Sequence, residues 1–382
     1  MMRQLITHLI FCCFCISVCI SCTSCSEQPA NHNPEEPLRL LWAYEYSKEV
    51  DGLSSVTLQP EIINTPTPSV IVALDRQFTR LSQEEGSIIW QQKVPDNQAY
   101  YINILNYDES YIYGKIHQST IYFAIDLQSG SLAWEKQNSH GEFYHYPRDG
   151  NNKKHIYLSG REPEIYVFSK KGEYKQTIQL QKRARAINAA NNKIFIKQAW
   201  KPDSTESAYG RIVSLDTETH QRNWQYETTR GGFYYADLVL DNGTLYTGGT
   251  SGPGIFVALD AATGQVKWEH PGLLTFRFTL ADGKIFVNDG QYIVALDQQT
   301  GKELWRQDFT YATTSNVAYL DGYVYHAHNG GLYVMDAQTG EVESGPLLSP
   351  DGSGFYNLNA ANGRVFVQSD FHLYCYQTYN RE

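Results

Sequence analysis

The sequence predicts an all-β fold, an eight-bladed β-propeller built from four-stranded antiparallel blades. Three observations lead to this prediction: a recurring segment that ends in tryptophan, tight-turn signals at regular intervals, and two chain ends that complete one another. The composition agrees, because Tyr (28) and Gly (29) are abundant while charged residues make up 19%. Aromatic residues favour strands, and glycine favours the tight turns between strands.

The recurring segment is clearest in three copies: AIDLQSGSLAW from Ala124, ALDAATGQVKW from Ala258 and ALDQQTGKELW from Ala295. Weaker or degenerate copies begin at Arg80, Val167, Ser214 and Val334. Between copies, turns such as DNG, ADG, LDG and ANG precede alternating strands, for which they supply the positive φ that a hairpin requires. Each unit therefore reads as four strands, with an inner strand A followed by B, C and an outer strand D.

Tryptophans mark the outer strand. Their spacing from Trp90 to Trp134, and again from Trp224 to Trp268, is 44 residues, the length of one propeller blade. A flat indole ring can fill the space between stacked sheets. We therefore expect six tryptophans to pack against the neighbouring blade as structural residues: Trp42, Trp90, Trp134, Trp224, Trp268 and Trp305.

The two ends of the chain predict how the ring closes. Seven units run from about Ser69 to Leu347, and the remaining C-terminal sequence provides only three strands of an eighth. The N-terminal segment LRLLWAYEY provides one strand, in which Trp42 stands at the strand-D position. We expect this strand to complete the last blade, so that residues 38–382 form one PQQ-like propeller.

The first residues read as a targeting signal. An apolar run from Leu5 to Ile20 follows Arg3, and small residues precede two cysteines. Residues 1–21 are therefore predicted to be a lipoprotein-type signal peptide and residues 22–37 a flexible tether. Cys22, or alternatively Cys25, is the expected lipidation site. This predicts export across the inner membrane to the periplasm or cell surface and a lipid anchor, with the outer membrane as the expected location.

The net charge and the absence of known motifs argue against several classes of function. The net charge is −10 and the sequence shows no basic stripe of the kind that nucleic acid binding needs, so no nucleic acid partner is expected. The sequence contains no G-x-S-x-G, P-loop or H-E-x-x-H motif, and the spacing of His140, Glu142 and His145 matches no standard metal signature. We predict no catalytic, cofactor-binding or metal-binding residues, although a carboxylate pair brought together by the fold stays open.

The loops on one predicted face contain more aromatic residues than tight turns require. The loops that lead into strand A contain AYY, GEFYHY, GGFYYA and GSGFYNL, and the longest B-to-C loop, from Lys197, contributes further aromatics to the same face. These residues either pack beneath the loops or form a binding face. The candidates for a binding face are Tyr101, Tyr144, Trp200, Tyr234 and Tyr356.

The motif ALDxxTGxxxW resembles the tryptophan-docking repeat of quinoprotein (PQQ) dehydrogenases and their non-enzymatic relatives, most clearly at Asp126, Asp260 and Asp297. The dehydrogenases of that family imply a vicinal cysteine pair and a Ca²⁺ site. The only vicinal pair here, Cys12 and Cys13, lies in the signal, and C-x-x-C-H is absent. Size, blade count and anchor resemble the BamB family of outer-membrane protein assembly factors.

That resemblance implies a non-catalytic envelope scaffold without a cofactor, a monomeric propeller that binds a protein or peptide and reaches the membrane only through its lipid. The alternative is a quinoprotein-like enzyme, or a propeller that binds a small molecule in its axial funnel.

Overall fold

The computed structural model describes residues 38–46, 60–64, 67–74, 77–94, 102–116, 119–143, 150–202, 208–234, 236–309 and 315–380. Within these ranges all regular secondary structure consists of β-strands, so the predicted all-β class is confirmed. Pro37–Glu382 forms one compact unit. The described residues include no helix long and apolar enough to cross a membrane.

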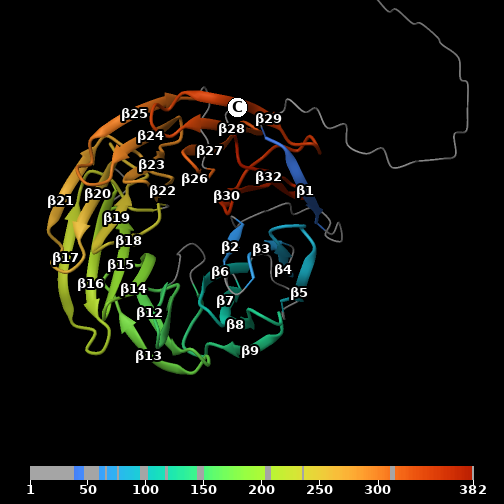
Figure 1. The fold of residues 1–382 in the computed structure, drawn as a ribbon. Helices are drawn as coiled ribbons and strands as arrows, with labels where there is room; N and C mark the ends of the chain where they lie inside the picture. Colours follow the sequence, from blue (N-terminus) through green and yellow to red (C-terminus); the bar gives the residue numbers. More distant parts are fainter. Residues whose placement is uncertain are drawn as a thin grey trace, which may run out of the picture. The chain divides into compact units, whose positions relative to one another are not determined.

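The strands form eight antiparallel sheets of four, which are the predicted blades (Figure 1). Blades 1 and 2 contain β2 (Glu61–Ile63), β3 (Ser69–Leu74), β4 (Gln77–Ser82), β5 (Ile88–Lys93), β6 (Ile102–Tyr107), β7 (Tyr111–Ile116), β8 (Ile121–Asp126) and β9 (Leu132–Gln137). Blades 3 and 4 contain β10 (Gly150–Asn151), β11 (His155–Ser159), β12 (Glu164–Ser169), β13 (Tyr174–Gln179), β14 (Ala184–Ala190), β15 (Lys193–Trp200), β16 (Tyr209–Asp216) and β17 (Arg222–Thr228). Blades 5 and 6 contain β18 (Val239–Asp241), β19 (Thr244–Gly248), β20 (Ile255–Asp260), β21 (Val266–Pro271), β22 (Arg277–Ala281), β23 (Lys284–Asn288), β24 (Tyr292–Asp297) and β25 (Glu303–Asp308). Blades 7 and 8 contain β26 (Val317–Leu320), β27 (Tyr323–His328), β28 (Gly331–Asp336), β29 (Val342–Leu348), β30 (Leu358–Ala361), β31 (Arg364–Gln368), β32 (His372–Gln377) and β1 (Leu40–Glu45).

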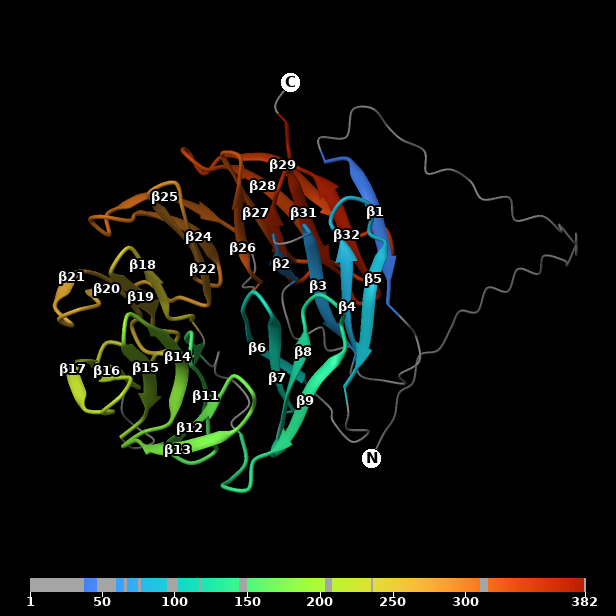
Figure 2. The ribbon, with the colours of Figure 1, turned by 60° about the horizontal axis from the view of Figure 1, so that its bottom comes forward.

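The ring closes as the chain ends predict. Strand β1 pairs antiparallel with β32, which places Trp42 opposite Cys375. The backbone N–H of Tyr46 donates to the carbonyl of Phe371 at 2.8 Å. Figure 2 shows β1 lying beside β32, with β5 of blade 1 next to it. The N-terminal strand is therefore the outer strand of the last blade.

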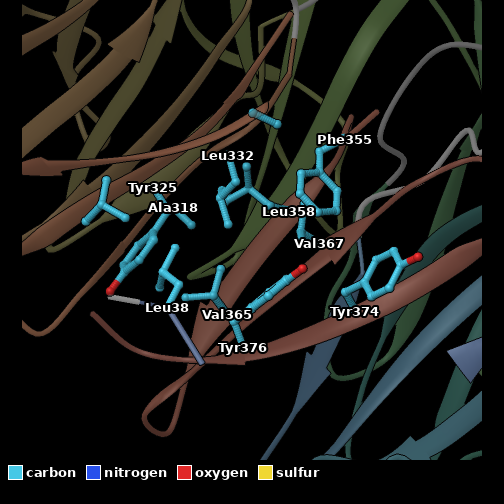
Figure 3. Packing of buried hydrophobic residues seen from close by; sticks show 12 residues of the cluster. Leu38, Ala318, Tyr325, Leu332, Phe355, Leu358, Val365, Val367, Tyr374 and Tyr376 are labelled. Atoms are coloured by element: carbon cyan, nitrogen blue, oxygen red, sulfur yellow. The ribbon is translucent and has the colours of Figure 1, made fainter. Parts of the chain in front are cut away.

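The core lies between the blades. One apolar cluster joins blades 7 and 8, and Figure 3 shows Leu332 of β28 close to Phe355 and Leu358 of the next blade. Leu38, which precedes β1, packs into the same cluster and is 2% exposed. Each fully buried side chain of this size contributes about 1.5–3 kcal/mol, so these clusters hold adjacent sheets together.

The D-x-x-T-G turn joins strands C and D and shapes the surface on which tryptophan docks. In blade 5, the Asp260 carboxylate accepts hydrogen bonds from the backbone N–H and the hydroxyl of Thr263. These hydrogen bonds lower the pKa of Asp260. Gly264 follows with φ +75°, and an added Cβ there would lie 2.5 Å from the Trp224 ring of blade 4. Glycine is thus required both for the backbone conformation and for the approach of the indole.

The six tryptophans predicted to dock each bridge to the next blade. Each indole N–H donates to a backbone carbonyl at 3.0–3.2 Å, from Trp42 to Gln83, Trp90 to Leu127, Trp134 to Lys170, Trp224 to Ala261, Trp268 to Gln298 and Trp305 to Ala337. All six rings lie against a turn glycine like the one at Gly264. Burial of the ring together with a satisfied N–H fixes neighbouring blades in register.

Two joints depart from this pattern. In blade 3, Gln176 occupies the tryptophan position opposite Val167, and the turn of blade 4 that faces it has His220 in place of glycine. The two side chains lie 3.5 Å apart. In blade 7, Ser344 occupies the position, and blade 8 has no C–D turn because its outer strand comes from the N-terminal segment. Where the indole is absent, the glycine that would receive it is absent too.

Candidate binding face

The antiparallel blades give the propeller two different faces. The A–B and C–D turns lie on one face, and the B–C and D–A loops lie on the other, since successive strands reverse direction. The turn face repeats the same short turns from blade to blade. The loop face has connections of unequal length, including the 201–208 loop of blade 4, of which residues 203–207 lie outside the described residues. Variation between blades is therefore concentrated on the loop face.

The Phe-Tyr pairs of the D–A loops divide between core and surface. The first aromatic is buried in each case, with exposed fractions of 2% for Phe143, 0% for Phe233 and 2% for Phe355. The second is half-buried at Tyr234 and 40% exposed at Tyr356. The phenylalanines thus seal the junctions between blades, whereas these two tyrosines lie nearer the solvent. Tyr101 and Tyr144, like Cys22 and Cys25, lie outside the described residues.

Trp200 stands at the end of β15 between two cations. The Arg211 guanidinium lies 4.8 Å from the ring centroid, and the Lys182 ammonium lies 5.5 Å from it. Tyr209 contacts the ring edge-on at 5.7 Å, on the facing strand β16. Arg211 is held in place by Glu227 at 2.5 Å and by Gln181 at 2.9 Å. The indole is therefore oriented by its neighbours and remains only half-buried.

Tyr234 has a similar neighbour, because the Arg185 guanidinium lies 4.9 Å from its ring centroid. Lys182 and Arg185 belong to the same short segment, in which Lys182 lies near the end of the D–A loop and Arg185 is the second residue of β14. This segment therefore links Trp200 and Tyr234, and the structure brings these two candidates into one cluster. We call it the blade 4 surface, which comprises Lys182, Arg183, Arg185, Trp200, Lys201, Arg211 and Tyr234.

The blade 4 surface is basic within an acidic chain. It has five cationic side chains, while the whole chain has a net charge of −10. The aromatics of this surface are predicted from the sequence, but its cations are not. The signal for them is the run KRAR at residues 182–185, the densest group of basic residues in the chain. The run alone does not reveal the basic surface, because Lys201 follows β15 and Arg211 lies on β16, and only the fold brings them beside it.

Tyr356 lies far from this surface in the ring order, at the junction of blades 7 and 8. Its hydroxyl donates to the carbonyl of Ser353 at 2.8 Å, and its backbone N–H donates to the carbonyl of Gln368 at 3.0 Å. Burial, followed by the charge of Asp370, raises the pKa of Tyr356. Among the described residues, Tyr356 and the blade 4 surface thus form two separate aromatic sites on the loop face.

Two buried titratable groups of the interior favour their neutral forms. Burial lowers the pKa of His326 to about 3 and raises the pKa of the Cys375 thiol to about 12. Among the described residues, no three His, Cys, Asp or Glu side chains group closely enough to hold a metal ion. Cys375 is the sole cysteine after residue 25, so the vicinal pair implied by a quinoprotein site cannot form here.

Comparisons with known proteins point to one family. The family described as outer membrane protein assembly factor BamB matches residues 117–272 and 208–381. The crystal structure of BamB from Moraxella catarrhalis is similar with a TM-score of 0.64 at 17% identity, covering 89% of this chain and 100% of that chain. No curated protein matches the sequence.

Enzymes share the fold. Quinohemoprotein alcohol dehydrogenases from Pseudomonas putida HK5 and Comamonas testosteroni have TM-scores of 0.64 at 13% and 12% identity. In each comparison 91% of this chain and 77% of the other chain are covered. At such identities the likeness is one of fold alone.

Proposed function

The chain belongs to the family of outer membrane protein assembly factor BamB, and from this premise we propose that it is a non-catalytic envelope scaffold that binds a protein partner through the blade 4 surface. The partner segment is acidic, or it presents backbone carbonyls that are not already hydrogen-bonded. The cluster of cations on half-buried aromatics is the observation that carries the proposal. The predicted lipid anchor would hold the scaffold at the outer membrane.

The blade 4 surface has the composition of a protein-binding site. Tryptophan, tyrosine and arginine are the residues most enriched among those that dominate interface energies, each worth roughly 2 kcal/mol or more on truncation. Arg211 stacks on Trp200 and also contacts Glu227, so its guanidinium is oriented before a partner arrives. Such preorganisation reduces the entropy that is lost on binding.

The test uses photo-crosslinking in cells. A photoreactive amino acid replaces Trp200 or Tyr234 in the lipidated full-length chain, and crosslinked proteins are identified by mass spectrometry. A probe at Lys302, an exposed residue in the C–D turn of blade 6, is the control. We expect one envelope protein to crosslink at blade 4 and not at Lys302.

Charge variants then test the mechanism. Lys182→Gln with Arg185→Gln should reduce that crosslink at least tenfold, because a surface contact between opposite charges is lost. Lys136→Gln with Lys302→Gln removes two exposed cations of blades 2 and 6 and should leave it unchanged. Equal crosslinking from both pairs, or a loss that follows a lower melting temperature, would contradict the proposed site.

The enzymatic alternative is tested directly. Pyrroloquinoline quinone and Ca²⁺ are added to the purified full-length chain, and oxidation of primary alcohols is followed with an artificial electron acceptor. The shared fold of the quinohemoprotein dehydrogenases is what motivates this assay. Turnover above that of the free quinone would overturn the scaffold proposal.

A further inference from the structure

Exposed apolar side chains gather on the loop face at the junction of blades 7 and 8. Leu348 at the end of β29 is 66% exposed, Phe371 in the B–C loop of blade 8 is 45% exposed, and Tyr356 in the D–A loop is 40% exposed. Leu348 has the largest exposed fraction among the large apolar residues described as exposed. We call these three residues with their loops the blade 7–8 surface.

Hydrogen bonds centred on Asp351 fix the loops beneath these side chains. Its carboxylate accepts from the Ser353 backbone at 3.0 Å and from the Ser369 hydroxyl, and it lies 2.9 Å from Nδ1 of His372. Although burial opposes it, these donors hold the pKa of Asp351 well below its usual range. Asp370 is tied to the same loop, since its N–H donates to the Ser353 hydroxyl at 3.1 Å.

The two loops therefore form one platform. Backbone hydrogen bonds from Tyr356 to Gln368 and from Gln368 to Asn357 join the D–A loop to the end of β31. Tyr46, at the end of β1, is bonded to Phe371 and adds the third element. A surface held in this way presents its apolar groups with little conformational freedom to lose on binding.

The charge around this surface is negative. The segments 44–46, 348–357 and 369–372 contain Glu45, Asp351 and Asp370 and no Lys or Arg. Glu45 is exposed and lies opposite His372 in the β1–β32 pair, and Asp370 follows Ser369 in the B–C loop. The blade 7–8 surface thus has the opposite charge to the blade 4 surface.

We propose that the blade 7–8 surface is a second docking site, which takes an extended peptide segment of a partner protein with apolar residues beside lysine or arginine. The apolar residues of the segment cover Leu348, Tyr356 and Phe371, and its cations face Glu45 and Asp370. The acidic rim repels anionic lipid head groups. It also opposes a second copy of this chain, because a two-fold contact would set two acidic surfaces against each other.

The inference goes beyond the scaffold proposal and rests on different residues. The probe is a labelled peptide of about twelve residues with alternating valine and lysine, which matches the period of an extended strand. Its binding to the full-length chain is measured by fluorescence anisotropy. Matched peptides replace every lysine by glutamate, or every valine by serine.

The critical variant is Leu348→Ser with Phe371→Ser. Its control is Val266→Ser with Leu304→Ser, which removes two apolar side chains of 46% and 45% exposure from outer strands. We expect the first pair to weaken peptide binding at least tenfold and the second to leave it unchanged. Glu45→Gln with Asp370→Asn should weaken binding and reduce its dependence on salt.

Three results would overturn the proposal. The two double-serine variants could bind the peptide equally, or the unmodified chain could bind the lysine and glutamate peptides equally. The unmodified chain could also form dimers that Leu348→Ser with Phe371→Ser dissociates. Circular dichroism melting of each variant separates lost binding from lost folding. Lys182→Gln with Arg185→Gln should not change binding of the valine–lysine peptide, so the two docking sites can fail independently.

Discussion

Two glycines of blade 6 allow the energetic effect of the contact between a docked tryptophan and its turn to be measured separately. Gly301, in the D-x-x-T-G turn, has φ +70°, and an added Cβ would lie 2.3 Å from the Trp268 ring. Gly283, in the A–B turn of the same blade, has φ +68°, and an added Cβ would meet nothing within 4 Å. The two positions share a backbone conformation and differ in the indole. Replacing each by alanine therefore separates the cost of conformation from the cost of the clash.

The expected magnitudes follow from these distances. A left-handed backbone costs an L-residue about 1–2 kcal/mol. Reduced freedom of the unfolded chain offsets about 0.4–1 kcal/mol of this. Gly283→Ala should thus lower the free energy of unfolding by about 1 kcal/mol. Gly301→Ala must also displace the Trp268 ring, and overpacking adds about 1–3 kcal/mol, for a total of about 2–4 kcal/mol.

The assay is urea unfolding followed by far-ultraviolet circular dichroism, with Trp268→Ala as a second background. In that background the clash is gone, and Gly301→Ala should cost no more than Gly283→Ala. Agreement of the two glycine variants within about 0.5 kcal/mol in the natural sequence, the scatter expected for independent sites, would contradict a steric clash with Trp268. A difference between them that survives in the Trp268→Ala background would contradict it as well.

Three further predictions concern the chain ends and the single cysteine of the propeller. Deleting Leu38–Tyr46 should leave β32 with an unpaired edge, and light scattering should then detect oligomers. A monomer with an unchanged melting temperature would contradict the closure. Changing both Cys22 and Cys25 to serine should release the folded protein from membranes in a fractionation, and persistent membrane association with an unchanged mature mass would contradict lipidation. Because burial raises the pKa of Cys375 to about 12, its thiol is protonated from neutral pH to about pH 10, and peptide mapping should find it unalkylated at pH 8 unless urea is added.

The sequence predicts the ring because each blade repeats the same local chemistry. Asp260 and Gly264 specify a turn through contacts within five residues, and such contacts are legible in the sequence. The ring closure is also predictable, because Trp42 matches the tryptophan position of an outer strand D, whereas a single isolated strand gives it no docking partner. These features repeat, and repetition is a strong signal.

The candidate surfaces are harder to predict because they depend on contacts between distant segments. Whether an aromatic of a Phe-Tyr pair faces inward is decided by the neighbouring blade, which buries Phe355 and leaves Tyr356 at the surface. The stacking of Arg211 on Trp200 joins two strands across a loop of blade 4. Neither the composition of a loop nor its length specifies such an arrangement.

The two irregular joints connect these observations. Outer strands β13 and β29 lack the docking tryptophan, with Gln176 and Ser344 in its place. Each strand leads directly into a D–A loop that contributes to one of the two proposed docking surfaces. Natural sequences depart from local consistency chiefly where function requires it. The two proposed surfaces thus follow the two outer strands that lack a docked indole, whereas the six tryptophan-bearing joints hold the other neighbouring blades in register.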